Sequence, residues 1–202
     1  LTNYNKILVQ RNNLLKQIRF QNNLIETLEA WDIQLVKYGS EVIKYREKFI
    51  KHLGEVCQKI HNKLTGGKEK ILLEYDRDVG YDSYLTELAK KRQKDLKYST
   101  TTVGPHRDDI SFIVNGIDIR KYGSQGQQRT AALSLKLAQI QLMREVMKES
   151  PILLLDDVLS ELDSNRKTYL LESIKDTQTI ITCTGLDEFI SKHLPIQRMF
   201  QI

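Results

Sequence analysis

A short apolar run that ends in two carboxylates constrains the fold of this chain more than any other feature. Residues Ile152 to Leu155 are four consecutive apolar residues, and Asp156 and Asp157 follow them at once. Such a run predicts a strand buried on both faces, as in a parallel sheet covered by helices. Open sheets of that class place their ligands at the carboxyl ends of the strands, where these two carboxylates would lie.

Two adjacent carboxylates at a strand end can serve nucleotide hydrolysis. One carboxylate can hold Mg²⁺ while the other is aimed at a water molecule. A strand followed by a solvated acidic turn explains the same residues equally well. The sequence that precedes the strand decides between these two interpretations.

The residues from Gly123 to Gln127 stand at the start of a long predicted helix. A helix N-terminus presents free backbone N–H groups to an anion, and Gly126 allows a close approach to the backbone. Ser124 and Gln127 also fit a capping box, with Ser124 as the N-cap and Gln127 at the third helical position. Capping and anion binding use the same geometry, so both roles are expected.

Together these motifs resemble those of the ABC-type ATPases. Ser124-Gln125-Gly126-Gln127 resembles the signature motif, and Ser160-Glu161-Leu162-Asp163 resembles the D-loop. The apolar run that ends in Asp156-Asp157 resembles Walker B.

The amino-acid sequence is more similar still to the RecF family of bacterial recombination mediators. The similarity includes V-G-P-H-R-D-D at residues 103–109 and the whole stretch from the signature to the D-loop. It extends into the first predicted helix, at Tyr4, Leu8, Gln10-Arg11-Asn12 and Leu14-Leu15-Lys16. The resemblance therefore covers nearly the whole chain.

The resemblance implies an α/β fold, with part of an ABC-type ATPase head and an antiparallel helical-hairpin arm. It implies a homodimer that forms with ATP and Mg²⁺, in which ATP lies between the phosphate loop of one subunit and the signature loop of the other. Asp156 is then expected to hold Mg²⁺, and Asp157 to orient or activate the attacking water. The expected nucleotide-binding residues are Ser124, Gln125, Gly126, Gln127, Ser160, Asp163 and Thr184, with Ser160 and Asp163 at the dimer seam.

The family's partners follow from the same resemblance. It implies binding of single-stranded and double-stranded DNA at gap junctions, and work with RecO and RecR to load RecA in repair, in replication and in the SOS response. An ABC transporter ATPase and an SMC-like structural protein are the alternatives. The long basic segment before the signature disfavours the first. An SMC-like protein needs longer coiled coils than this chain supplies. About 60 helical residues form two helices of roughly 40 Å each.

Two features depart from the ABC pattern. No G-x-x-x-x-G-K-[ST] phosphate loop is present, and Thr65-Gly66-Gly67-Lys68 is the nearest approach. We therefore expect this chain, which begins with Leu, to be the carboxyl-terminal part of a protein whose intact dimer is a weak ATPase, and to hydrolyse no ATP alone. Most ABC proteins have a histidine after the next strand, where this sequence has Cys183-Thr184-Gly185. A hydroxyl of Thr182 or Thr184 would bind a phosphate more weakly, which predicts slow hydrolysis.

The residues before the motifs predict a helical region. Helical periodicity runs over residues 4–30 and again over residues 32–64, which predicts two antiparallel helices joined near Trp31. We expect an arm domain over residues 1–98, completed by a strand and a helix, and a head domain over residues 99–202.

Basic charge is concentrated in the predicted arm. Residues 1–98 hold 19 Lys and Arg against 13 Asp and Glu, whereas residues 99–202 hold 12 against 13. The first helix carries no acidic residue up to residue 24. An acid-free face suits a polyanion, and an arm that only packs on itself is an equally good interpretation. The residues predicted to contact DNA are Lys6, Arg11, Lys16 and Arg19.

Two further segments have distinct signals. His106-Arg107-Asp108-Asp109 could hold a metal or serve acid–base chemistry, but a structural ion-pair group neutralised by Arg107 is the preferred interpretation, because a third clear ligand is missing. Asn115-Gly116 between two alternating apolar runs predicts a β-hairpin.

The remaining composition excludes other classes of protein. Cys57 and Cys183 lie in unrelated segments without metal-ligand spacing, and they are expected to be small buried side chains in a reducing compartment. No apolar run approaches the roughly 18 residues of a membrane span. A cytoplasmic protein that does not contact membranes is therefore expected.

Overall fold

The computed structural model describes residues 1–182 and residue 198, and the chain divides into two compact units. Unit 1 comprises residues 1–52 and 73–111, and unit 2 comprises residues 53–72 and 112–202. These units interleave along the sequence, whereas the predicted domains meet once, between residues 98 and 99. The predicted domain boundary between residues 98 and 99 is placed from the sequence motifs, and it stays a prediction. The predictions for Cys183 and Thr184 lie outside the described residues.

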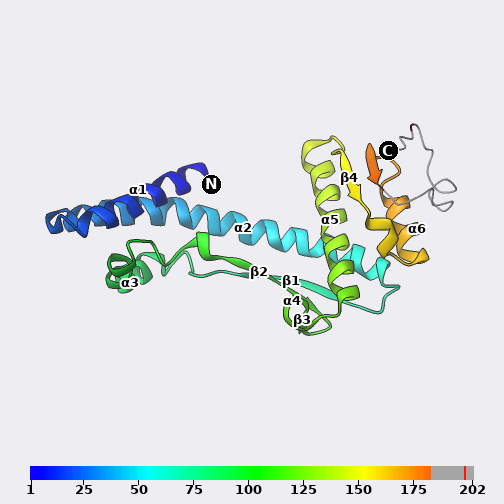
Figure 1. The fold of residues 1–202 in the computed structure, drawn as a ribbon, viewed down its shortest axis with the longest axis horizontal. Coiled ribbons are helices and arrows are strands. Elements are labelled where there is room, and N and C mark those ends of the chain that lie inside the picture. Colours follow the sequence, from blue (N-terminus) through cyan, green and yellow to red (C-terminus); the bar gives the residue numbers. More distant parts are fainter. Residues whose placement is uncertain (183–197, 199–202) are drawn as a thin grey trace. The chain divides into compact units, whose positions relative to one another are not determined.

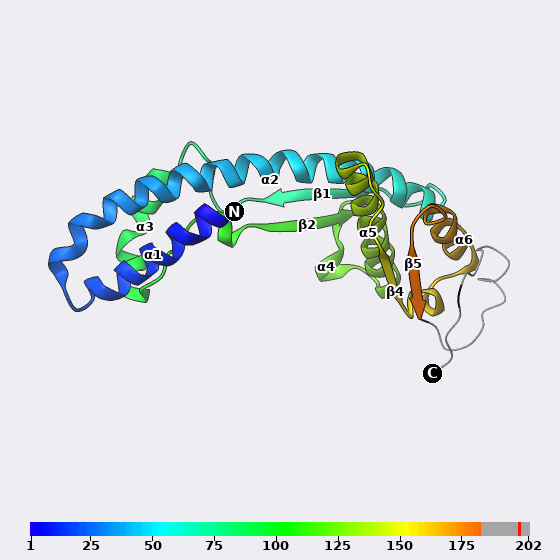
Figure 2. The ribbon, with the colours of Figure 1, turned by 90° about the horizontal axis from the view of Figure 1, so that it is seen from above.

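Two helices that run side by side form much of unit 1. Helix α1 spans Thr2–Ile18, a short 3₁₀ helix η1 spans Asn22–Thr27, and helix α2 spans Leu28–Leu64. Figures 1 and 2 both show α1 alongside the first part of α2. The predicted pair of antiparallel helices is therefore present.

The predicted joint near Trp31 is wrong, because α1 ends at Ile18 and Trp31 lies within α2. The N–H groups of Phe20 and Gln21 both donate to the carbonyl of Gln17, which closes the last turn. The short polar residues Asn22 and Asn23 then favour a turn over a continued helix. Trp31 packs instead against the apolar cluster around Leu15 and Leu28.

A second apolar cluster in unit 1 brings α1 and α2 together with helix α3, which spans Tyr84–Tyr98. Its members include Tyr4, Leu35, Ile43 and Tyr84, all nearly or fully buried. Two glycines make room for the tyrosines. A Cβ on Gly39 would lie 2.5 Å from a ring carbon of Tyr84, and one on Gly104, where φ is +136°, would lie 2.1 Å from the Tyr84 hydroxyl. Only glycine fits these two positions.

The polar centre of unit 1 is the fully buried guanidinium of Arg11. Its Nε donates to Asp32 of α2 at 2.7 Å, and its Nη1 donates to Asp95 of α3 at 2.8 Å. Nη1 also donates to the hydroxyl of Thr101 at 2.8 Å. Arg92 donates to the other oxygen of Asp32 at 2.9 Å, so two cations face two buried carboxylates. This balance of charge is what makes burial of Arg11, Asp32 and Asp95 tolerable, while Arg92 is partly exposed.

A sheet with strand order β1-β2-β3 is formed by Ile71–Asp76, Asp109–Val114 and Ile117–Asp118. The predicted hairpin at Asn115-Gly116 is confirmed, because β2 and β3 pair antiparallel with Val114 opposite Ile117. Both turn residues have positive φ, 50° and 83°, as a two-residue hairpin turn of the common type requires. Strand β3 has only two residues, because Asp118 caps a helical turn, α4 (Ile119–Tyr122).

Unit 2 carries the motif residues on alternating helices and strands. Helix α5 spans Gln125–Met147, β4 spans Leu153–Asp156, the 3₁₀ helix η3 spans Val158–Glu161, α6 spans Ser164–Ser173, and β5 spans Thr179–Thr182. Strands β4 and β5 pair in parallel, with Asp156 opposite Thr182 (Figure 2). This order of elements is the mixed helix-and-sheet architecture that the sequence predicts.

The prediction that residues 152–155 are buried on both faces is wrong. Leu155 is 7% exposed, but Ile152 and Leu154 are 62% and 68% exposed. Alternate side chains of a strand point to opposite faces. The described residues therefore cover one face of the β4-β5 pair, next to Leu155, and leave the other face bare.

Replacement of Arg11 tests whether its ion pairs organise unit 1. We expect Arg11→Ala to lower the free energy of unfolding by about 3–5 kcal/mol, because it leaves Asp32 and Asp95 buried without their shared cation. Urea denaturation measures this loss. Lys16→Ala is the matched control on the exposed side of the same helix, and it should change stability by less than about 0.5 kcal/mol. Equal losses in the two variants would contradict this role for Arg11.

Candidate functional site

The signature loop lies at the N-terminus of α5 and is closed by the predicted capping box. The Gln127 N–H donates to Ser124 Oγ at 3.2 Å, and the Ser124 N–H donates to Gln127 Oε1 at 3.1 Å. Ser124, Gln125 and Gly126 are exposed, while Gln127 is half-buried. Ser124 is thus the N-cap and Gln127 the third helical residue, as the sequence predicts.

The same loop retains groups that suit an anion. Ser124 Oγ accepts in the capping box, so its own hydrogen stays available to a ligand. The N–H groups of Gln125 and Gly126 lie in the first helical turn, where the helix offers no acceptor. The first turn of α5 contains no acidic residue. Partial positive charge at this end of the helix favours a phosphate group.

The two Walker B carboxylates have different surroundings, although both are exposed. Asp156 ends β4, and its Oδ1 accepts a hydrogen bond from the hydroxyl of Thr182 on β5. Asp157 has a φ of 50°, in the left-handed region that Asp tolerates better than most residues. Its N–H donates to the Thr182 carbonyl at 3.2 Å and to the Thr182 hydroxyl at 3.1 Å.

Thr182 makes contacts that the sequence analysis does not predict. Its hydroxyl donates to Asp156 and accepts from the Asp157 N–H, so it holds the strand end, and its contact with a phosphate stays a prediction. The sequence contains a signal for the contact with Asp156. Parallel strands that both end in polar residues bring those residues to the same sheet edge.

The D-loop residues make local contacts in this chain. The Ser160 hydroxyl donates to the Asp157 carbonyl at 2.8 Å. Asp163 is the N-cap of α6, where its side chain accepts from the Arg166 N–H at 3.0 Å and pairs with the Arg166 guanidinium at 3.3 Å. Both side chains sit on the turn that follows Walker B, close in sequence to Asp157.

The carboxylates of Asp156 and Asp157 suit only one type of Mg²⁺ site. Within the described ranges, no three His, Cys, Asp or Glu side chains gather as a metal site. Mg²⁺ is commonly bound by one or two carboxylates with waters and substrate phosphates. The exposed carboxylates of Asp156 and Asp157 fit that type of site, and they do not fit an all-protein cage.

Within the polar cluster at residues 106–109, Asp108 makes structural contacts of the kind preferred from the sequence, but the cation that it pairs with is Arg46 rather than Arg107. Asp108 accepts from Arg46 at 2.9 Å, from the Tyr75 hydroxyl and from the Asp78 N–H at 3.0 Å. These contacts use both carboxylate oxygens of Asp108 for packing within unit 1.

His106 belongs to the same structural group. Its Nε2 lies 3.0 Å from the Thr101 carbonyl, which can only accept, so the hydrogen of the neutral ring is on Nε2. Its Nδ1 then accepts from the Tyr4 hydroxyl at 2.7 Å. Burial raises the pKa of Tyr4 to about 12, which keeps that hydroxyl protonated. Partial burial of the ring lowers the pKa of His106.

The residues predicted to contact DNA are not equivalent. Lys6, Lys16 and Arg19 are exposed on α1 or at its end. Arg11 is not available to DNA, because its side chain is fully buried between Asp32 and Asp95. The absence of acids from the first helix misled this prediction, since the carboxylates that pair with Arg11 come from α2 and α3.

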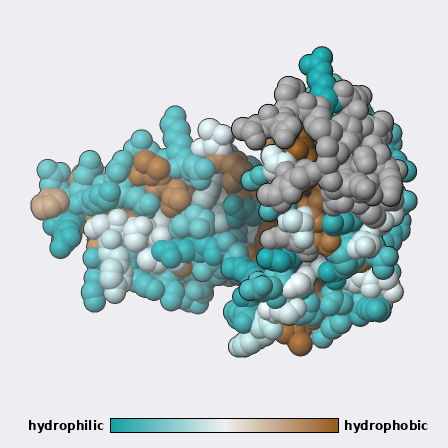
Figure 3. Space-filling view, turned by 45° about the vertical axis from the view of Figure 1, so that its right-hand side comes forward, coloured by the Kyte–Doolittle hydropathy of each residue, from teal (hydrophilic) through white to brown (hydrophobic). Residues whose placement is uncertain are grey.

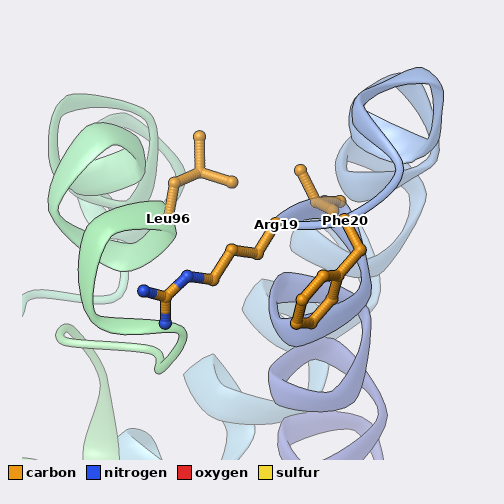
Figure 4. Close-up of a pocket in the computed structure, with 4 residues that line it drawn as sticks. Arg19, Phe20 and Leu96 are labelled. Carbon is orange, nitrogen blue, oxygen red and sulfur yellow. The ribbon is translucent and has the colours of Figure 1, made fainter.

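Arg19 lies beside an exposed aromatic ring. A shallow cleft is lined by Ile18, Arg19, Phe20 and Leu96 (Figure 4). Phe20 is 86% exposed. Leu96 reaches the cleft from α3, opposite the Arg19 side chain (Figure 4).

Helix α3 adds basic residues that the sequence analysis did not single out. Lys91, Lys94 and Lys97 are exposed, while Asp95, the only acid in the last two turns, is buried against Arg11. The spacing of three residues places these lysines along one side of the helix. Figure 3 shows a mostly hydrophilic surface, with scattered hydrophobic patches, on its left-hand side. The sequence alone does not show this row, because it does not show that Asp95 is buried while the lysines are exposed.

Two curated relatives, both named DNA replication and repair protein RecF, are similar to the whole chain. The protein from Agathobacter rectalis is 55% identical over 202 residues, and the one from Lachnospira eligens is 55% identical over 204 residues. Each match covers 100% of this chain and 56% of the relative. The chain thus spans about half the length of the curated relatives it matches.

The solved structure of the recombination mediator protein RecF-ATP in the RecFOR pathway is similar in fold and sequence. It superposes with a TM-score of 0.84 and is 39% identical, covering 93% of this chain and 52% of that chain. No family model matches the sequence. Among the described helices, none is long and apolar enough to cross a membrane.

Proposed function

The chain belongs to the RecF family, and we propose that it supplies the signature, Walker B and D-loop half of an ATP-binding head, with an arm that contacts DNA. In this proposal two copies of the full-length protein dimerise on ATP. The whole protein then acts as a recombination mediator in the cytoplasm. It works at single-stranded gaps with RecO and RecR to load RecA, within DNA repair, replication and the SOS response.

The exposed signature loop is the observation that carries the proposal. Ser124, Gln125 and Gly126 face solvent at a helix N-terminus, and a hydroxyl hydrogen and two amides are available there. The 202 residues of this chain contain no phosphate-loop motif that could bind the same nucleotide. A partner's γ-phosphate is the anion that this loop would receive, as the resemblance to ABC-type heads implies.

The Walker B residues divide the chemistry between them. Asp156, oriented by Thr182, would hold Mg²⁺, and the ion when bound neutralises charge on the phosphate oxygens. Asp157 makes its described contacts through its backbone, so its carboxylate is available to orient the attacking water. Ser160 and Asp163 are proposed to lie at the dimer seam. Thr184 is proposed to contact nucleotide, and it is outside the described residues.

DNA contact is assigned to exposed cations of unit 1. Lys6, Lys16 and Arg19 offer charge to a phosphate backbone, and the row on α3 adds to it. Such contacts release counterions, so they give affinity that weakens with salt. Arg11 has no part in this surface.

Ser124→Arg tests the nucleotide sandwich in a full-length RecF-family protein that contains this region. The variant should bind ATP as a monomer through its own phosphate loop, because the signature faces the partner. It should fail to dimerise with ATP and should lose hydrolysis, since a bulky cation fills the place of the γ-phosphate. Loss of the N-cap costs only about 1 kcal/mol, so the variant should fold. Sedimentation with and without ATP measures the dimer. ATP-driven dimerisation of the variant would reduce Ser124 to a helix cap.

Replacement of each Walker B carboxylate by its isosteric amide separates their roles in the same protein. Asp157→Asn should bind ATP within about twofold of wild type and lose turnover, which traps the dimer. Asp156→Asn should weaken ATP binding in the presence of Mg²⁺ and leave Mg²⁺-free binding unchanged. Equilibrium binding and single-turnover hydrolysis measure the two effects. If both variants lose ATP binding equally, this division of roles is wrong.

The salt dependence of DNA binding tests the α1 surface. Lys16→Gln with Arg19→Gln should make the slope of log affinity against log salt less negative by about 1.8, or about 0.9 for each lost phosphate contact. Fluorescence anisotropy with duplex DNA at several salt concentrations gives the slope. Lys48→Gln with Lys51→Gln, two exposed lysines of α2, is the matched control. The same slope in wild type and in the Lys16 and Arg19 variant would remove this surface from the DNA interface.

A further inference from the structure

A ring of polar side chains within unit 2, hydrogen-bonded except between His61 and Glu69, begins and ends in the signature loop. Its first side leads outward from Gln127. The amide oxygen of Gln127 accepts from the Ser124 N–H, and its amide nitrogen donates to Glu69 Oε1 at 3.1 Å. The other oxygen of Glu69 lies 3.3 Å from Nε2 of His61, a residue near the end of α2.

The second side of the ring leads back to the same loop. His61 Nδ1 lies 2.9 Å from the Ser134 hydroxyl oxygen. The Ser134 hydroxyl donates to the Thr130 carbonyl at 2.7 Å, and the Thr130 hydroxyl donates to the Gly126 carbonyl at 2.7 Å. The ring therefore contacts both the amide side and the carbonyl side of the signature loop.

Most of this ring is shielded from water. His61 and Ser134 are fully buried, and the Glu69 side chain is 20% exposed. Burial is the main cause that lowers the pKa of His61, and the Glu69 carboxylate opposes it. The Ser134 hydroxyl gives its one hydrogen to Thr130, so it accepts from His61 Nδ1. His61 Nε2 then faces Glu69 Oε2 with no hydrogen bond between them. The Gln127 amide donates to the other carboxylate oxygen, Glu69 Oε1, so this bond does not depend on His61.

The backbone of Glu69 is also fixed. Its N–H donates to the Thr65 hydroxyl at 3.3 Å, and the Thr65 hydroxyl donates to the His61 carbonyl at 2.8 Å. The next residue, Lys70, donates its N–H to the Asn115 side chain at 2.9 Å. Glu69 thus stands on a short, anchored connection between α2 and β1, and its carboxylate has a defined place beside Gln127.

We propose that Glu69 is a positioning residue for nucleotide-driven dimerisation, because it fixes the Gln127 amide and through it the phosphate-facing conformation of Ser124 to Gln127. The inference rests on the proposed role of the signature loop. A loop held in its binding conformation loses less freedom when the ligand arrives, and this gives tighter association. Without Glu69 the Gln127 amide is free to rotate, and the Ser124 N–H loses a fixed acceptor.

Two replacements of Glu69 test this role in a full-length RecF-family protein that contains this region. Glu69→Ala removes the acceptor. Glu69→Asp keeps the charge but withdraws the carboxylate by about one C–C bond, ~1.5 Å. Both should weaken ATP-dependent dimerisation about tenfold, as expected for one hydrogen bond to a charged group. The affinity of the monomer for nucleotide should stay within about twofold of wild type. A general loss of folding would instead lower both dimerisation and nucleotide affinity. Glu69→Gln keeps an acceptor for Gln127 and should restore dimerisation.

Glu74→Ala is the matched control, since Glu74 is an exposed carboxylate on β1 five residues away. It should dimerise as wild type does. Wild-type dimerisation by Glu69→Asp would overturn the proposal, and so would a failure of Glu69→Gln to dimerise better than Glu69→Ala.

Hydrogen exchange at the Ser124 amide provides a readout that does not depend on dimerisation. Glu69→Ala and Glu69→Asp should speed exchange there, because the Gln127 acceptor is no longer held, while Glu69→Gln should not. Unchanged exchange in both Glu69→Ala and Glu69→Asp would overturn the role of Glu69 by itself. If the wild-type protein fails to dimerise with ATP, the proposed function fails, and the exchange result still decides whether Glu69 holds the loop.

Discussion

The packing of unit 1 depends on the burial of one guanidinium. Arg11 lies at 0% exposure and joins α1 to Asp32 of α2 and to Asp95 of α3. Apolar contacts alone would allow helices to slide or rotate against each other, since the hydrophobic effect has no direction. A planar guanidinium with partners on two other helices allows one arrangement only. Arg92 completes the charge balance, and a buried set of this kind is costly unless each member is paired.

The ion pairs of Arg11 also explain why the local sequence pattern wrongly predicts that Arg11 contacts DNA. Arg11 shares its helix with Lys6 and Lys16, and the segment alone makes all three look like one basic face. The carboxylates that bury Arg11 are 21 and 84 residues away, so a window of the sequence does not contain them. The exposed faces of Ile152 and Leu154 are missed for a related reason. An apolar run indicates a strand, but its burial depends on what else packs against it.

The features predicted well are those fixed by neighbouring residues. The capping box needs only Ser124 and Gln127, three residues apart, and the hairpin turn needs only the positive φ angles that Asn115 and Gly116 tolerate. The motifs that define the family are of the same local kind, so their places on helix and strand ends follow from the sequence. The contacts that hold these motifs are not local. Glu69 precedes Gln127 by 58 residues, and Thr182 follows Asp156 by 26.

The Walker B turn shows how two adjacent, identical side chains acquire different surroundings from the backbone. Asp156 is the last residue of a paired strand, and its carboxylate is oriented by the hydroxyl that lies opposite it. Asp157 leaves the strand with a φ of 50°, which turns the chain sharply into η3. Its N–H is used by Thr182, and this bond fixes the turn without engaging the carboxylate. A strand-end carboxylate with a fixed orientation suits a ligand that demands defined geometry, such as Mg²⁺. A carboxylate free of protein partners among the described residues suits a mobile water, so the difference between the two residues lies in one backbone angle and one threonine.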